Sequence, residues 1–86
     1  MKSSTKKSFR SRLQALPPEI RTLARKNFLL WLRDPHHPSI HFKKVGRFWS
    51  ARVGSEHRAL AIMTGECVEW FWIGLHDEYE RIIGGR

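Results

Sequence analysis

The chain has 86 residues, a length that suits one domain, because a chain this short buries only about 60 to 65% of its unfolded surface and has no room for two cores. Four Trp, five Phe and one Tyr exclude a disordered chain, which would be poorer in large apolar side chains. Residues 1–55 hold 13 Lys or Arg against two acidic residues, a net of +11, whereas residues 56–86 hold three against six, a net of −3. This basic excess favours a polyanionic partner, since each neutralised phosphate releases counterions; a highly charged soluble surface is the alternative.

Cysteine content and hydropathy indicate a cytoplasmic protein. Cys67 is the single cysteine, so an internal disulfide is excluded, and its strand-like neighbours indicate a small buried side chain. The longest wholly apolar runs, at residues 28–32 and 70–73, fall far short of the roughly 20 residues that span a bilayer. No apolar segment follows the basic N-terminus, so we expect neither a secretory signal nor a membrane segment.

The N-terminal half predicts a flexible segment and two helices. Residues 1–7, MKSSTKK, offer nothing to bury and are expected to fray or to become ordered on a partner, whereas residues 8–86 are expected to form a single domain. Phe9, Leu13 and Leu16 recur at i, i+4 and i+7, which predicts a short helix from Ser8, with a strand as the alternative. Two prolines at 17 and 18 end it.

The second helix is expected from Pro18 to about Arg33. Pro18 suits a first helical turn, and Glu19 is favourable near the positive end of the helix dipole. One apolar stripe runs along it, formed by Ile20, Leu23, Ala24, Phe28 and Trp31. Asp34 and Pro35 follow the stripe and stop the helix.

After a turn at 36–39 the hydrophobic period changes from 3.6 to 2, which predicts four strands. We expect them at residues 40–43, 48–53, 57–64 and 67–73, with Gly46, Gly54 and Gly65 in the intervening breaks. The short turns predict antiparallel neighbours, and the last strand is apolar on both faces apart from Glu69. A terminal helix follows over residues 77–83. The expected fold is α+β, with two N-terminal helices packed on one face of a four-stranded antiparallel sheet and the other face free for a ligand.

Arg58 conflicts with strict alternation, which places it on the same face as Leu60 and Ile62, where an unpaired guanidinium is costly to bury. Either Arg58 lies at the strand end with its head in a cleft, or a β-bulge shifts the register. The run Trp70-Phe71-Trp72 also has two interpretations, because aromatic side chains can pack in a core or stack on bases. Core packing is favoured.

Four motifs in order and spacing resemble the RelE/ParE superfamily of bacterial toxins. They are FKK at 42–44, WSARV at 49–53, EHRAL at 56–60 and WIGLHDEY at 72–79, and the similarity covers roughly residues 16–83. The resemblance implies the toxin of a type II toxin–antitoxin system. RelE-like members are metal-independent, ribosome-dependent endoribonucleases that cut messenger RNA, which implies an mRNA interferase without a cofactor. ParE-like members instead inhibit DNA gyrase, so the alternative is a non-enzymatic gyrase inhibitor or a nucleic-acid-binding module.

The resemblance also implies site residues. Arg58 matches a catalytic arginine, with a structural pairing to Glu56 or a backbone carbonyl as the alternative. Arg52, Lys43 and Lys44 match basic positions that hold the scissile phosphate and flanking RNA; Arg47 and His41 are assigned to RNA binding with them. His76 and Tyr79 fall where many members carry C-terminal catalytic residues, the alternatives being a helix cap and a core anchor.

The chain departs from the family before its first basic strand, where some members use a glutamate as the base. The sequence DPHHPS at 34–39 has no Glu, and His37 or His41 remains as a substitute. The adjacent histidines His36 and His37 and the nearby His41 have only Asp34 beside them, so we expect no metal site. The implied partners are messenger RNA on the ribosome and a cognate antitoxin, in a hetero-oligomer, whose acidic or apolar segment covers the basic face.

Overall fold

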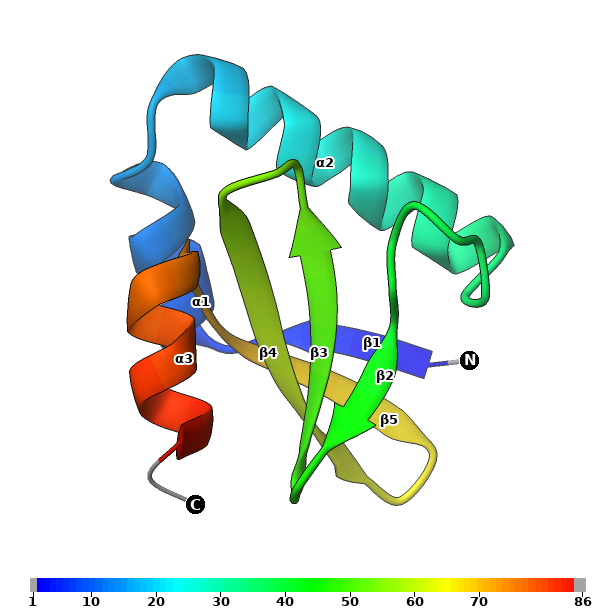
Figure 1. The fold of residues 1–86 in the computed structure, drawn as a ribbon. Helices are drawn as coiled ribbons and strands as arrows, with labels where there is room; N and C mark the ends of the chain where they lie inside the picture. Colours follow the sequence, from blue (N-terminus) through cyan, green and yellow to red (C-terminus); the bar gives the residue numbers. More distant parts are fainter. Residues whose placement is uncertain (1, 85–86) are drawn as a thin grey trace.

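A computed structural model describes residues 2–84 of the chain as one five-stranded sheet with three helices (Figure 1). The elements in chain order are β1 (Lys2–Thr5), α1 (Lys7–Gln14), α2 (Pro18–Arg33), β2 (Lys43–Val45), β3 (Phe48–Val53), β4 (His57–Thr64), β5 (Cys67–Leu75) and α3 (His76–Gly84). The strand order is β1-β5-β4-β3-β2. The α+β class, the three helices and three of the four expected strands are therefore confirmed. The strand expected at residues 40–43 instead spans Lys43–Val45, because the positive φ of His41 interrupts the extended backbone before it.

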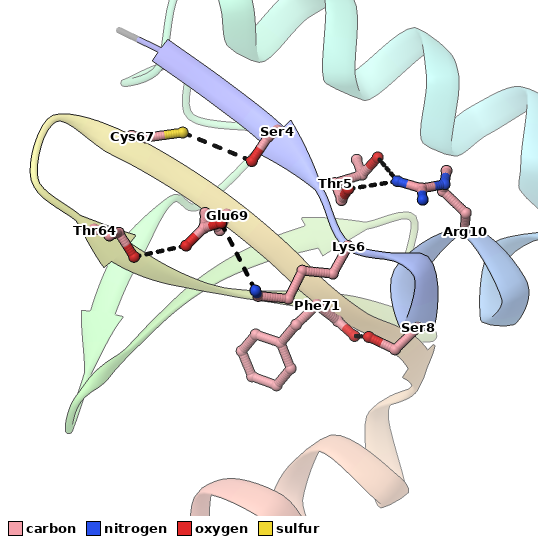
Figure 2. A network of polar contacts seen from close by, with 9 residues as sticks. All are labelled: Ser4, Thr5, Lys6, Ser8, Arg10, Thr64, Cys67, Glu69 and Phe71. Carbon is pink, nitrogen blue, oxygen red and sulfur yellow. Dashed lines mark hydrogen bonds and ion pairs between the residues drawn. The ribbon is translucent and has the colours of Figure 1, made fainter.

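The first strand corrects the expectation of a frayed segment at residues 1–7 and of four strands. β1 pairs in parallel with β5, from Lys2 opposite Cys67 to Thr5 opposite Trp70, so the sheet is mixed. Figure 2 shows how side chains support this edge: Lys6 forms an ion pair of 3.7 Å with Glu69, and the Ser8 hydroxyl donates to the Phe71 carbonyl at 2.7 Å. Polar contacts and backbone pairing hold β1 in place. Its sequence has no alternating apolar pattern, so the hydrophobic periodicity does not predict this strand. Met1 lies outside the described residues.

One face of the sheet is covered by α1 and α2. Trp31 of α2 is the centre of this layer, only 2% exposed, with edge-to-face ring contacts of 5.3 Å to both Phe42 and Trp70. Ala51 and Val53 of β3 join the same cluster, as the alternation along that strand predicts. The short segment after Lys6 is a helix, and the competing strand is not formed.

The opposite face carries α3, which corrects the expectation that this face is free. Tyr79 of α3 is 5% exposed and packs with Leu60 of β4 and Trp72 of β5, and Ile82 joins the cluster. Because α3 covers only part of the face, the region beside it remains open and forms the cleft described below.

A β-bulge separates the aromatic residues of β5. Leu60 of β4 pairs with Trp72 and Ala61 pairs with Trp70, so Phe71 has no partner in that register. Consequently Trp70 packs on the side of α1 and α2, whereas Phe71 and Trp72 pack on the side of α3. Both tryptophans are buried, which confirms core packing for them.

Arg12 of α1 joins the end of β5 to the start of α3. Its guanidinium lies over the Trp72 ring at 5.1 Å from the ring centre, and its Nε donates to the Ile73 carbonyl at 2.9 Å. A second nitrogen contacts Glu78 of α3 at 3.4 Å. These contacts hold the beginning of α3 against the sheet. No helix within residues 2–84 has the length and apolar character needed to cross a membrane.

Candidate functional site

A cleft of about 260 Å³ lies between α3 and the edge of the sheet formed by β2, β3 and β4. Its lining is mostly polar and positively charged. The residues are His41, Lys43, Val45, Ser50, Arg52, Arg58, His76, Tyr79, Glu80 and Ile83. Six of them are residues that the sequence analysis assigned to catalysis or RNA binding: Arg58, Arg52, His76, Tyr79, Lys43 and His41.

Two arginines occupy directly opposed positions on neighbouring strands. Arg52 of β3 faces Arg58 of β4 in the antiparallel register, an arrangement of like charges that destabilises a sheet. Burial, and next the charge of Arg52, lower the pKa of Arg58 from its ordinary value, while Tyr79 and Glu80 act in the opposite direction. The two arginines therefore place two positive charges close together in the cleft, and this arrangement does not stabilise the fold.

The arginine heads retain hydrogen-bond donors for a ligand. Arg52 Nε is buried and has no hydrogen-bond partner within residues 2–84. Arg58 donates one bond, from Nη1 to the His57 carbonyl at 2.8 Å, which is the backbone pairing considered as its structural alternative. Both residues line the cleft, so an anion such as a phosphate that enters it can accept from the guanidinium N–H groups that are open to the cleft, which do not include the buried Arg52 Nε.

The position of Arg58 resolves the conflict in the sequence pattern. It shares a face with Leu60, and the bulge lies beyond both residues, so it does not change their relative orientation. Arg58 is the second residue of β4, and its side chain lines the cleft rather than the core. The strand-end interpretation is therefore correct.

The floor of the cleft connects β3 to α3. The Ser50 hydroxyl donates to the Tyr79 hydroxyl at 3.1 Å, and both residues are buried. Tyr79 is thus both a core residue and a lining residue, because its ring packs with Leu60 while its hydroxyl reaches Ser50.

His76 is the first residue of α3, and its backbone amide donates to the Glu56 carbonyl at 2.8 Å. One helical turn later, Glu80 places Oε1 at 3.2 Å from His76 Nε2. Glu80 was not identified from the sequence, although its i,i+4 spacing from His76 on an expected helix is a usable signal.

His41 lines the cleft from the side opposite α3, two residues before the start of β2. It has a φ of 50° and is the one non-glycine residue with positive φ in residues 2–84. The preceding Ile40 is fully buried, and its carbonyl accepts a bond from the Arg52 amide at 2.6 Å. His41 is therefore fixed beside Arg52.

Of the remaining candidate residues, one lines the cleft and three lie outside it. Lys43 is opposite Ser50 in the register and lines the cleft, whereas Lys44 is opposite Trp49 and does not. Arg47 lies in the β2–β3 turn over the ring of Phe48 at 5.1 Å, outside the cleft. His37 hydrogen-bonds with Ser39 at 2.8 Å and is not a lining residue.

Metal-ligating side chains do not gather in the described part of the chain: residues 2–84 hold no group of three or more His, Cys, Asp or Glu that could hold a metal ion.

The face covered by α1 and α2 has a second, larger opening. This apolar groove, with a volume of about 350 Å³, lies between those helices and the sheet. Among its lining residues, Phe28 is 37% exposed and Leu29 is 60% exposed, and Arg25 lies at the same place. Trp31 also lines the groove, and its buried indole Nε1 has no hydrogen-bond partner in residues 2–84.

No protein-family model matches the sequence, and no curated protein matches it. Solved structures do match. A chain of the RelB–RelE antitoxin–toxin complex from Methanococcus jannaschii has a TM-score of 0.70 and 15% identity, over 91% of this chain and 95% of that one. The YoeB/ParE toxin from Agrobacterium tumefaciens has a TM-score of 0.66 and 18% identity, over 88% and 99%.

A third similar structure is the toxin–antitoxin complex RelBE2 from Mycobacterium tuberculosis, with a TM-score of 0.61 and 21% identity, over 87% of this chain and 96% of that one. At these identities the likeness concerns the fold. The chain has the fold of RelE- and ParE-type toxins, as the resemblance of its motifs predicted.

Proposed function

We propose that this protein is the toxin of a type II toxin–antitoxin system and acts as a metal-independent endoribonuclease on ribosome-bound messenger RNA. The observation that carries the proposal is the cross-strand pair of Arg52 and Arg58, which places two neighbouring guanidinium groups in the lining of one cleft. The toxin fold of the similar structures supports the biological role.

Metal-free RNA cleavage requires groups that stabilise charge and groups that move protons. The phosphoryl oxygens gain negative charge as the 2′-oxygen attacks, and fixed cations stabilise that charge most where solvent is excluded. Arg52 and Arg58 supply these cations, and Lys43 holds the adjacent backbone. His76 and Tyr79 line the same cleft, and proton transfer is assigned to them in this proposal.

Residues outside the cleft extend the RNA contact. Lys44 and Arg47 are exposed near the β2–β3 turn, beside the lysine that lines the cleft. They contribute attraction to phosphates that depends on salt and not on base sequence. RNA that passes through the cleft therefore meets a continuous basic edge of the sheet.

The antitoxin is proposed to bind the apolar groove on the face of α1 and α2, in place of the basic face that the sequence led us to expect. Phe28 and Leu29 are large apolar side chains exposed beside an open groove, a combination that marks an interaction surface. The first 55 residues carry a net charge of +11, which repels a second copy of this chain and attracts an acidic segment. We therefore expect an amphipathic antitoxin segment with apolar residues in the groove and acidic residues at its rim.

Growth rescue tests the location of the antitoxin. Leu29→Glu is expected to remain toxic and to lose neutralisation by the cognate antitoxin, because a carboxylate enters the apolar contact. Met63→Glu is the matched control, since Met63 is also an exposed apolar side chain but lies at the end of β4, outside the groove. Equal neutralisation of both variants would place the antitoxin elsewhere.

Induction in bacterial cells without an antitoxin tests the activity, with mapping of messenger RNA 5′ ends. We expect new ends inside translated codons with the wild type and with Arg81→Ala, an exposed arginine of α3 that does not line the cleft, and none with Arg58→Ala. Growth arrest with intact transcripts would overturn the nuclease and favour a gyrase inhibitor. Cleavage by Arg58→Ala would remove the arginine pair from the mechanism.

A further inference from the structure

A second group of side chains forms a stack at the turn between β2 and β3, beside the cleft. The Arg47 guanidinium lies over the Phe48 ring, 5.1 Å from its centre, which is within the range of a cation–π contact. The Phe48 ring contacts the Phe71 ring, with 5.5 Å between the two ring centres. Both rings are half-buried, whereas Arg47 is exposed. The order of the stack is therefore Phe71, Phe48, Arg47, and its outermost member is a planar cation at the surface.

The strand register connects this stack to the cleft. Val45 lines the cleft and is the register partner of Phe48. Phe48 and Arg52 are four residues apart on β3, so both side chains point to the α3 side of the sheet, roughly 13 Å apart at the usual rise of a strand. A single strand of RNA with one phosphate at Arg52 and Arg58 can therefore extend along β2 and β3 and bring a flanking nucleotide to the stack.

The surroundings of Arg47 suit a base and not only a phosphate. No carboxylate forms an ion pair with Arg47 within residues 2–84, so its guanidinium is held by the Phe48 ring on one face. The opposite face of the guanidinium is left to the solvent, since Arg47 is exposed. Bases of single-stranded RNA stack on aromatic rings and on the planes of arginine side chains. A guanidinium that is already stacked loses less freedom when a base binds to it.

We propose that Arg47, supported by Phe48 and Phe71, is a stacking site for one base of single-stranded RNA that flanks the phosphate in the cleft; this inference rests on the proposed function, which places that phosphate at the arginine pair. The base lies on the outer face of the Arg47 guanidinium and extends the stack by one ring. Every base has a π-face, so the site requires a base and does not read its identity. Lys44, in contrast, contributes charge alone.

Two RNAs of equal charge test the stacking site in a binding experiment. The probes are a labelled single-stranded adenosine hexamer and a hexamer of the same ribose–phosphate backbone without bases. Both carry 2′-O-methyl groups, which prevent attack by the 2′-oxygen during the measurement. We expect the wild type to bind the adenosine hexamer about 5-fold or more tightly than the abasic one, which is the size of one stacking contact. Arg47→Ala should abolish this preference.

Three further variants separate stacking from charge. Arg47→Lys keeps the positive charge and removes the planar group, so it should lose the preference for bases as Arg47→Ala does. Phe48→Leu removes the ring beneath the guanidinium and should reduce the preference, while urea unfolding verifies that the variant folds. Lys44→Ala is the matched control, because Lys44 is an exposed cation of the same edge that lies outside the cleft. It should weaken the binding of both RNAs by the same factor.

The binding experiment and the mapping of messenger RNA ends give independent answers. A preference for bases that depends on Arg47, in a wild type that produces no new messenger RNA ends, supports the stacking site and overturns the nuclease. New ends together with no binding, with equal binding of the two hexamers, or with an Arg47→Lys variant that keeps the wild-type preference, overturn the stacking site and leave the nuclease in place.

Discussion

Arg52 and Arg58 are directly opposed on neighbouring strands, so their two positive charges lie close together. Like charges in this position repel each other and lower the stability of the sheet. Desolvation adds to the cost, because it disfavours the charged form of Arg58. Such an arrangement is typical of a site where stability is given up for ligand binding. The repulsion between the two arginines should therefore change the free energy of unfolding, which can be measured without an activity assay.

Arg58→Met is expected to raise the free energy of unfolding by about 0.5 to 1 kcal/mol, because it removes a like-charge cross-strand pair while keeping an unbranched apolar stem. The gain should shrink as salt is added, since salt screens the repulsion in the wild type. Urea unfolding at low and high salt measures both effects. Arg58→Lys, which keeps the charge, is the control, and an equal gain from it would exclude charge repulsion as the cause.

Tyr79→Phe is expected to lower the free energy of unfolding by about 1 to 3 kcal/mol, because the buried Ser50 hydroxyl loses its partner. The double variant with Ser50→Ala should be closer to the wild type than the sum of the two single variants predicts, since both partners are then removed together. Urea unfolding of the four proteins measures the coupling. Strict additivity would show that the Ser50–Tyr79 bond does not contribute.

Gly74→Ala is expected to destabilise the fold by about 1 to 3 kcal/mol through overpacking. A Cβ at Gly74 would come within 2.6 Å of the Trp72 ring and within 3.0 Å of the Arg12 head, both of which are held in place. Gly84→Ala is the control, because a Cβ there meets nothing within 4 Å. Thermal unfolding compares the two, and a neutral Gly74→Ala would mean that Trp72 moves without cost.

Ser3→Ala tests whether β1 contributes to stability. The Trp70 indole donates to the Ser3 hydroxyl at 3.1 Å, and Trp70 is buried, so loss of the acceptor should cost about 1 to 3 kcal/mol. Ser4→Ala is the matched control on the same strand, since the Ser4 hydroxyl has a long contact with Cys67 Sγ, at 3.7 Å, rather than a bond to a buried indole. A frayed N-terminus, in contrast, would make both substitutions neutral in urea unfolding.

Much of the fold follows from patterns in the sequence because the cause of each element is local. The paired prolines after Leu16 end one helix and open the next, and the change of period after Asp34 predicts β2 to β5 in order and in antiparallel pairing. Alternation along β3 also places Arg52 opposite the apolar face correctly. The site residues themselves were assigned from the resemblance of the motifs, and six of those eight residues line the cleft.

Only the tertiary structure decided the features that depend on contacts distant in the chain. β1 forms because a polar segment finds the free edge of β5 some 65 positions later in the sequence, and no local pattern records that pairing. The bulge at Phe71 places Trp70 and Trp72 on opposite faces, which two-residue alternation forbids. The packing of α3 onto the second face brings Glu80 and His76 beside the arginines, because burial of Tyr79 decides where that helix lies.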